Sequence, residues 1–319
     1  MKILMTEPLR PSGQQRFAEA DVEIIMPEAL TEEALVEAVR DVEGIAVRSA
    51  KLTPNVIAAA PELRAVARHG VGFDNVAVDA LSARNIPLLL AINANAVSVA
   101  EHTMYMMLTL AKRGRLYDAA ARASDFGFRN APIAIDIAEK TLTIVGFGRI
   151  GTRLAPRALA FDMKVNVYDP YVDDEVIIAA GCTPVSDLQS VLPETLFLTV
   201  HCPLNAETQG IVGAAELALL PADAFVINCA RGGIVNESAL AQALADERIA
   251  GAGVDVYETE PPSQNHPFLA DQRMILSPHS AGVSVEAATR MSFETADNLL
   301  AALAGEVRVE ALANPQIVA

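Results

Sequence analysis

The sequence has 319 residues, of which 52% are hydrophobic, and a formal net charge of −16. A single hydrophobic core usually stops growing near about 250 to 300 residues, so we expect two domains. The 40 acidic residues against 24 basic ones repel phosphates and anionic lipids at long range, which argues against nucleic-acid and membrane partners.

Two further features narrow the class of protein. The first apolar run, Ile3 to Met5, is too short for a signal peptide, and no stretch reaches the roughly 18 apolar residues of a spanning helix, so we expect a cytoplasmic protein. The three cysteines, Cys182, Cys202 and Cys229, have no Cys-x-x-Cys spacing and cannot pair evenly. We therefore expect neither a disulfide framework nor a bound metal.

Short apolar runs alternate with helical patterns in the first hundred residues. One helical pattern covers 31–40 behind a Thr31 cap, and another covers 53–60 with Pro54 at its first position. The expected strands are 3–5, 22–25, 44–47, 65–67 and 88–90. Strands that alternate with helices predict an α/β fold with a parallel sheet.

A long helical pattern follows from Ser98 to Arg115. Its apolar stripe, with Met104 and Met107 among its members, favours a homodimer, although the stripe could instead pack within its own chain. A second alternation then places strands near 142–145, 165–168, 196–200, 225–228 and 252–254.

The last helical pattern, 286–303, would bring the chain back to the first domain. We thus expect a cofactor domain of residues 99–291 inserted into a substrate-binding domain of residues 1–98 and 292–319.

A glycine turn, Gly146-Phe147-Gly148-Arg149-Ile150-Gly151, lies between the strand at 142–145 and a helix expected at 149–161. In this motif Gly146 allows the tight turn, Gly148 lets a pyrophosphate approach the backbone and Gly151 lets helix and strand pack closely. The free N–H groups at the start of the helix would bind the pyrophosphate.

Asp169 follows the next strand at about the 20-residue spacing of a ribose-binding acid. A carboxylate there accepts hydrogen bonds from both ribose hydroxyls and repels a 2′-phosphate, so the expected cofactor is NAD rather than NADP. The other interpretation is that Asp169 only opens the turn at Pro170.

Three polar residues, Arg231, Glu260 and His279, each stand in a loop rich in glycine or proline. An arginine can hold a carboxylate through two hydrogen bonds and polarise the adjacent carbonyl. A carboxylate beside a histidine favours the imidazolium, which can protonate a ketone oxygen. Together these residue types fit a dehydrogenase acting on keto acids.

Several long motifs closely resemble those of the D-isomer-specific 2-hydroxyacid dehydrogenases, which include phosphoglycerate dehydrogenase and the glyoxylate/hydroxypyruvate reductases. They are VRSAKLT from Val47, HGVGFDN from His69, NANAVSVAEH from Asn93, GFGRIG from Gly146, HCPL from His201, NCARGGIVNE from Asn228, GVDVYETEP from Gly253 and SPHSAGVS from Ser277. The resemblance implies two Rossmann-like lobes, a flavodoxin-like substrate domain and an inserted NAD-binding domain, with the active site in the cleft.

The resemblance also implies roles for individual residues. Arg231 would anchor the substrate, His279 would act as the acid/base, and Glu260 would orient and charge that histidine. The dinucleotide would contact, besides the glycine turn with Arg149 and Ile150, the residues Cys202, Cys229, Ala230 and Asp255, the last facing the carboxamide. The substrate would contact Val71 and Gly72 through backbone N–H groups, Arg48 and, as a second arginine, Arg129. We expect the remaining histidines to be structural or cofactor-lining: His69, His102, His201 and His266.

Two alternatives stay open. Formate dehydrogenase shares the fold but has a glutamine-histidine pair at the site. The carboxylate of Glu260 in this sequence therefore argues against a formate dehydrogenase. A corepressor-like protein that senses NAD has the same fold without catalysis. The substrate is open among glyoxylate, hydroxypyruvate, the phosphorylated acid and sulfopyruvate. Since the sequence ends at Ala319, soon after the returning helix, we expect no regulatory domain of the kind many phosphoglycerate dehydrogenases carry.

Overall fold

The computed structural model describes residues 1–318 and divides into two compact units. Unit 1 comprises Met1–Asn95 with Val283–Ala319, and unit 2 comprises Ala96–Gly282. These boundaries lie at Asn95 and Gly282 rather than at residues 98 and 291, because each of the two long helices next to them belongs wholly to one unit.

Unit 1 contains a five-stranded parallel sheet in the order β2-β1-β3-β4-β5. All five expected strands are confirmed: β1 (Lys2–Met5), β2 (Glu23–Ile25), β3 (Gly44–Val47), β4 (Ala65–Arg68) and β5 (Leu88–Leu90). The order reverses between β1 and β3, which is the flavodoxin-like arrangement that the resemblance implied.

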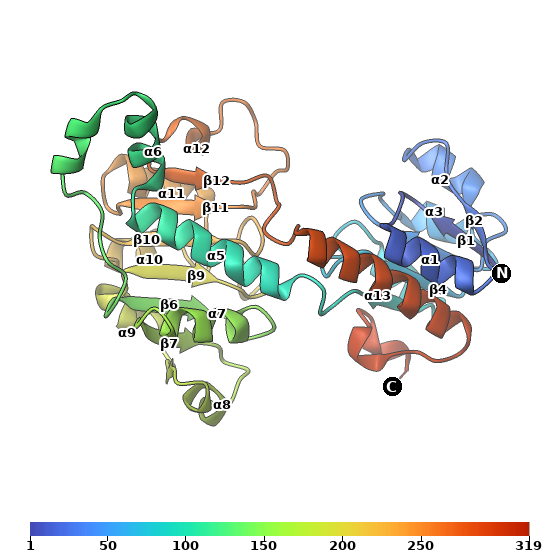
Figure 1. Cartoon of the computed structure of the whole chain (residues 1–319). Coiled ribbons are helices and arrows are strands. Elements are labelled where there is room, and N and C mark those ends of the chain that lie inside the picture. Colours follow the sequence, from blue (N-terminus) through green and yellow to red (C-terminus); the bar gives the residue numbers. More distant parts are fainter. Residues whose placement is uncertain (319) are drawn as a thin grey trace. The chain divides into compact units, whose positions relative to one another are not determined.

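Helices cover both faces of this sheet (Figure 1). One face packs on α2 (Glu32–Ala38), α3 (Pro54–Ala58) and α4 (Val78–Ser82), and the other on α1 (Pro11–Glu19) and α13 (Val285–Leu303). The expected Thr31 cap is confirmed, since Thr31 accepts a hydrogen bond from Ala34 N–H. Pro54 opens α3 as expected, and Thr53 caps that helix by accepting a hydrogen bond from Val56 N–H. The short 3₁₀ turns η3 (Val309–Ala311) and η4 (Pro315–Ile317) follow α13.

Unit 2 contains a seven-stranded parallel sheet in the order β12-β11-β10-β9-β6-β7-β8. Its strands are β6 (Thr141–Val145), β7 (Lys164–Tyr168), β8 (Thr183–Pro184), β9 (Phe197–Val200), β10 (Phe225–Asn228), β11 (Gly251–Val254) and β12 (Met274–Leu276). The five strands expected in this half are confirmed, and β8 and β12 are additional.

Two layers of helices enclose this sheet (Figure 1). One face packs on α5 (Ala96–Ala111), α7 (Gly151–Leu159) and α8 (Asp174–Ala179). The opposite face packs on α9 (Leu188–Val191), η2 (Leu192–Glu194), α10 (Ala214–Leu219), α11 (Glu237–Ala245) and α12 (Pro267–Ala270). The α/β fold with two parallel sheets is therefore confirmed.

The helix expected from Ser98 to Arg115 is shorter than predicted. It ends as α5 at Ala111, because Arg113 adopts a left-handed backbone with φ of 50°, and α6 (Gly114–Arg122) and η1 (Phe126–Asn130) follow. The segment Lys112-Arg113-Gly114-Arg115 interrupts the apolar spacing here, and basic residues followed by glycine are a helix-end signal that could have located the break.

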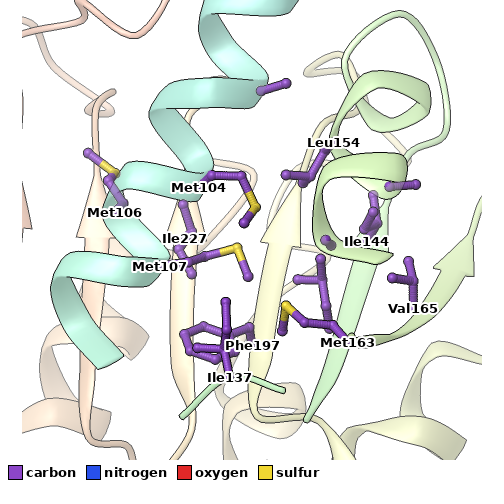
Figure 2. Close-up of a cluster of buried hydrophobic side chains, with 14 of the residues drawn as sticks. Met104, Met106, Met107, Ile137, Ile144, Leu154, Met163, Val165, Phe197 and Ile227 are labelled. Atoms are coloured by element: carbon purple, nitrogen blue, oxygen red, sulfur yellow. The ribbon is translucent and has the colours of Figure 1, made fainter. Parts of the chain in front are cut away.

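The methionine stripe of α5 faces the core of its own unit. Met104 and Met107 point toward Phe197 and Ile227 of the sheet, with Leu154 of α7 beside them (Figure 2). Met104 is 6% exposed and Met107 is fully buried. The stripe therefore packs within its own chain, and the observation that favoured a homodimer is instead part of the core.

Candidate active site

The carboxyl ends of six strands in unit 2 lie in one row. Val145 of β6 pairs with Tyr168 and Val200, Asn228 pairs with Val200 and Val254, and Val254 pairs with Leu276. The residue after each strand end therefore lies at the same edge: Asp169, Gly146, His201, Cys229, Asp255 and Ser277. The strand order reverses between β6 and β9, where ligands bind in open parallel sheets.

The glycine turn lies at this reversal. Gly146 has φ of 98°, and a Cβ there would come within 2.8 Å of the main chain of His201 and Cys202. A Cβ at Gly151 would lie 2.3 Å from the Gly146 carbonyl oxygen. A Cβ at Gly148, by contrast, would meet no protein atom within 4 Å. Packing within the protein therefore requires glycine at 146 and 151, whereas the open side of Gly148 fits the approach of a ligand.

Asp169 connects β7 to the glycine turn. Its Oδ2 accepts a hydrogen bond from Phe147 N–H at 2.7 Å, and its Oδ1 accepts one from Tyr171 N–H at 3.0 Å. These bonds hold the carboxylate beside the start of α7. A carboxylate has further lone pairs that can accept from ribose hydroxyls. The turn, the helix start and this acid together fit a dinucleotide.

Three buried or half-buried groups near this edge stay uncharged at neutral pH. Burial lowers the pKa of His201 to about 3, and its Nδ1 is buried without a hydrogen-bond partner among the described residues. Burial raises the pKa of Cys202 to about 11. Burial, together with the charge of Asp255, raises the pKa of Cys229 far above its usual range. These thiols are not activated nucleophiles, which need a lowered pKa.

The loop that carries Arg231 begins at the end of β10. The amide of Asn228, which is 3% exposed, fixes this loop: its Oδ1 accepts from Ala230 N–H at 3.0 Å and its Nδ2 donates to the Arg231 carbonyl at 2.8 Å. The Arg231 guanidinium donates to the Ala230 carbonyl at 2.6 Å and is half-buried. The hydrogen bond to Ala230 thus orients the Arg231 guanidinium within the loop that carries it.

Gly232 brings the arginine loop against the loop after β11. A Cβ at this position would lie 2.1 Å from the Tyr257 carbonyl and 2.4 Å from the Glu258 nitrogen. Only glycine permits such an approach. The same stretch then leads to Glu260, whose Oε1 accepts a hydrogen bond from Tyr257 N–H at 3.1 Å.

Glu260 and His279 form a hydrogen-bonded pair, with Oε2 of the carboxylate 2.8 Å from Nδ1 of the ring. The two side chains are 37% and 48% exposed, so both can reach a ligand. Because Glu260 engages Nδ1, Nε2 is the ring nitrogen that can exchange a proton with a substrate.

Asp255 fixes the loop that carries His279. The carboxylate is 1% exposed and accepts hydrogen bonds from Ser277 Oγ, Ser280 N–H and Ala281 N–H at 2.5, 2.8 and 2.9 Å. The main-chain carbonyl of Asp255 accepts a hydrogen bond from His279 N–H at 2.7 Å. The structure thus gives Asp255 a positioning role that the sequence did not indicate, beside its expected place at the cofactor.

The residues expected to bind substrate in the first domain lie at the carboxyl edge of the sheet of unit 1. Arg48 follows β3 and is exposed, while Val71 and Gly72 follow β4. Arg48 N–H donates to Thr6 Oγ1 at 3.2 Å, at the reversal between β1 and β3. Arg129 lies instead in η1 of unit 2, an exposed segment that packs on α6.

Sequence reasoning missed β12 and the polar residues that support the loops of Arg231 and His279. Met274 to Leu276 is an apolar run directly before Ser277, so its position could have indicated a strand that ends at the histidine loop. The hydrogen bonds of Asn228 and Asp255 had no local sequence signal. Among residues 1–318, no three His, Cys, Asp or Glu side chains are grouped to hold a metal ion, and no helix is long and apolar enough to cross a membrane.

Known proteins resemble this chain in sequence and in fold. The family model described as "D-isomer specific 2-hydroxyacid dehydrogenase, NAD binding domain" matches residues 104–281, all within unit 2. The D-3-phosphoglycerate dehydrogenase of Methanocaldococcus jannaschii is 35% identical over 318 residues, which cover 99% of this chain and 60% of that protein. The chain spans somewhat more than half the length of the curated relatives it matches.

Solved structures are similar to this chain over nearly all of its length. The NADPH-dependent glyoxylate/hydroxypyruvate reductase of Sinorhizobium meliloti, in complex with NADP and malonate, is 30% identical with a TM-score of 0.83, covering 94% of this chain and 92% of that one. The NAD-dependent formate dehydrogenase of Staphylococcus aureus, in complex with NAD, is 27% identical with a TM-score of 0.84, covering 98% of each chain.

Proposed function

Because this chain belongs to the D-isomer specific 2-hydroxyacid dehydrogenase family, we propose that it interconverts a small 2-keto acid and the matching 2-hydroxy acid with NAD. The observation that carries this proposal is the 2.8 Å contact between Glu260 and His279, on the sheet edge that also holds the glycine turn and the Arg231 loop. A proton donor and a cation that can bind a carboxylate are the groups this reaction needs from the protein.

Each of the three residues has a distinct part. Arg231 binds the substrate carboxylate and polarises the neighbouring carbonyl. His279 gives its Nε2 proton to the carbonyl oxygen in reduction and takes it back in oxidation, while Glu260 holds the ring through Nδ1 and stabilises the imidazolium. When bound, NAD would supply the hydride chemistry: its reduced nicotinamide would give a hydride to the carbonyl carbon, and its oxidised form would take one from the same carbon of the hydroxy acid.

The cofactor would lie along the row of strand ends. Gly146, Gly148 and Gly151 with the start of α7 would hold the pyrophosphate, and Asp169 the ribose. Further contacts would come from Arg149, Ile150, Cys202, Cys229, Ala230 and Asp255. Asp169 supports NAD over NADP, a choice worth testing because the reductase of S. meliloti is NADPH-dependent.

We assign further substrate contacts, beside that of Arg231, to residues of unit 1. Val71 and Gly72 would donate N–H groups to the carboxylate, and Arg48 would meet a second anionic group if the substrate carries one. The curated relatives favour 3-phosphoglycerate, and the solved structures favour hydroxypyruvate or glyoxylate. Arg129, on the exposed η1, is the weaker arginine candidate.

A homodimer remains part of the proposal, on a different observation from the methionine stripe. Helix α6 has no buried residue, and the apolar side chains of Leu116 and Phe126 are 45% and 68% exposed. Such a surface is better covered by a second copy than by water. Light scattering at micromolar concentration should give about twice the chain mass of 33.8 kDa, and the chain mass itself would contradict this.

A cytoplasmic location, where thiols stay reduced, fits the three free cysteines.

The test is turnover of a panel of keto acids with NADH. The panel contains glyoxylate, hydroxypyruvate, phosphohydroxypyruvate and sulfopyruvate, with formate oxidation as a separate arm. We expect reduction of at least one keto acid, with loss of turnover in Arg231→Ala and His279→Ala. NADH binding without turnover of any acid would contradict the proposal and favour a corepressor-like sensor. Formate oxidation alone would favour a formate dehydrogenase.

A further inference from the structure

A chain of hydrogen bonds leads from α5 to the loop that carries His279. His102 Nε2 lies 3.0 Å from Ser277 Oγ, and Ser277 Oγ lies 2.5 Å from Asp255 Oδ1. His102 and Ser277 are half-buried, and Asp255 is 1% exposed. His102 belongs to α5, and Ser277 and Asp255 follow the ends of β12 and β11. These hydrogen bonds therefore join a helix to the strand edge that holds the proposed site.

Counting protons gives this chain a direction. A carboxylate only accepts hydrogen bonds, and Asp255 already accepts from Ser280 and Ala281 N–H. The single hydroxyl proton of Ser277 must therefore point to Asp255, which leaves its oxygen to accept from His102. His102 consequently donates through Nε2–H, as both the neutral Nε2–H tautomer and the imidazolium can. Burial lowers the pKa of His102 while the charge of Asp255 opposes that shift, which agrees with a neutral ring.

The far end of the chain supports a strained residue. His279 has φ of 52°, a left-handed conformation that residues other than glycine seldom adopt. The bonds that Asp255 makes to Ser277, Ser280, Ala281 and the His279 N–H surround that residue. Misplacement of a catalytic group by about 1 Å can cost about a hundredfold in rate.

We propose that His102 is a positioning residue: by donating to Ser277 it fixes the hydroxyl on Asp255, and thereby holds the loop in which His279 exchanges its proton. This inference rests on the proposed dehydrogenase function, because it assigns a task to a residue that does not touch the substrate.

Two substitutions at position 102 separate this role from a simple packing role. Glutamine can place an amide N–H about where Nε2 lies, whereas asparagine reaches only about as far as Nδ1. We expect His102→Gln to retain at least half of the parent kcat, and His102→Asn to lose roughly tenfold, with the KM for the keto acid changed less than about twofold. Equal losses in both variants, or no loss in either, would overturn the proposal.

A second pair of variants tests the middle of the chain. Ser277→Thr keeps the hydroxyl and should retain activity, whereas Ser277→Ala should lose as much kcat as His102→Asn. The double variant His102→Asn with Ser277→Ala should be no slower than either single variant, because both break the same chain. Losses that multiply would show that the two residues act separately. All rates are taken below the melting temperature of each folded variant.

A spectroscopic measurement tests the chain without turnover. In protein labelled with ¹⁵N-histidine, the signals lost in His102→Gln identify the ring, and its nitrogen shifts report the tautomer. We expect a neutral ring protonated on Nε2 at pH 7. A proton on Nε2, with or without one on Nδ1, fits the proposed direction, whereas a proton on Nδ1 alone would overturn it. If no keto acid is turned over, the proposed function fails while the tautomer still decides whether this chain of bonds exists.

Discussion

Gly232 lies so close to Tyr257 that a Cβ at position 232 would come within 2.1 Å of the Tyr257 carbonyl carbon and oxygen. The two residues belong to the loops after β10 and β11, which carry Arg231 and Glu260. The spacing between the proposed carboxylate anchor and the partner of His279 is therefore set by a backbone contact that tolerates only hydrogen at this position.

Replacing this glycine should separate the two loops. We expect Gly232→Ala to reduce turnover by about a hundredfold, since small misplacements of catalytic groups are costly, and to lower the melting temperature by overpacking. Gly114→Ala is the matched control, because its new Cβ would lie 3.8 Å from its nearest neighbour. Parent-like kinetics and melting of Gly232→Ala would show that the main chain yields without cost.

The glycines of the turn should respond differently to the same change. Gly151→Ala places a Cβ 2.3 Å from the Gly146 carbonyl oxygen and should destabilise unit 2. Gly148→Ala meets no protein atom within 4 Å, so its melting temperature should stay unchanged while NADH affinity falls by roughly tenfold or more. Calorimetry and NADH fluorescence titration measure the two quantities. Unchanged NADH affinity in Gly148→Ala would argue that the pyrophosphate does not approach this position.

The charge of Glu260 should matter beyond its hydrogen bond. Glu260→Gln can still accept from Nδ1 of His279 but cannot stabilise an imidazolium, so keto-acid reduction should slow by about ten- to a hundredfold. His279→Gln should lose roughly 10² to 10⁴ in kcat. NADH affinity should stay unchanged in both, and Glu258→Gln, in the same loop, serves as the control. Full activity of Glu260→Gln would show that the ring needs only an acceptor.

Asp169 should set the cofactor preference. We expect NADH to exceed NADPH by at least tenfold in kcat/KM, about 1.4 kcal/mol, because a carboxylate repels the 2′-phosphate. Asp169→Asn keeps an acceptor for the Phe147 N–H and should narrow this ratio, whereas Asp169→Ala should also raise the KM for NADH by loosening the turn. Equal use of both cofactors by the parent enzyme would contradict this role.

His69 should make unit 1 sensitive to acid. Burial, helped by the positive charges of Arg48 and Arg68, lowers its pKa to about 4. Between about pH 6.5 and pH 4 this histidine is protonated in the unfolded chain, where its pKa is near 6.5, but stays neutral in the folded protein. The free energy of unfolding therefore keeps its full value above pH 6.5 and falls as the pH decreases toward 4. The variant His69→Gln can keep the hydrogen bond to Ser292. Its melting temperature should fall less between pH 7 and pH 5 than that of the parent protein. Parallel melting curves would assign the acid sensitivity to other groups.

The strands of both units could be predicted because their apolar, β-branched runs are continuous, as in parallel sheets covered on two faces. The edge that gathers Asp169, Gly146 and Asp255 follows from the same rule, since parallel strands end at one edge. The two residues of β8 are too few to form such a run, whereas the apolar run of β12 directly before Ser277 could have indicated a strand.

What could not be predicted depends on contacts between distant segments. The approach of Gly232 to Tyr257 involves segments 25 residues apart. The hydrogen bond from His102 to Ser277 joins residues separated by 175 positions. Local sequence carries no record of such pairs, which is why His102 was expected only to be structural or cofactor-lining.

Arg231, Glu260 and His279 all belong to unit 2, whereas Arg48, Val71 and Gly72 belong to unit 1. Under the proposed function, the proton-transfer pair and the additional substrate contacts would therefore lie on separate pieces of the chain. A hybrid that takes residues 1–95 and 283–319 from a relative with another substrate, and residues 96–282 from this protein, should adopt the relative's substrate and retain this protein's coenzyme.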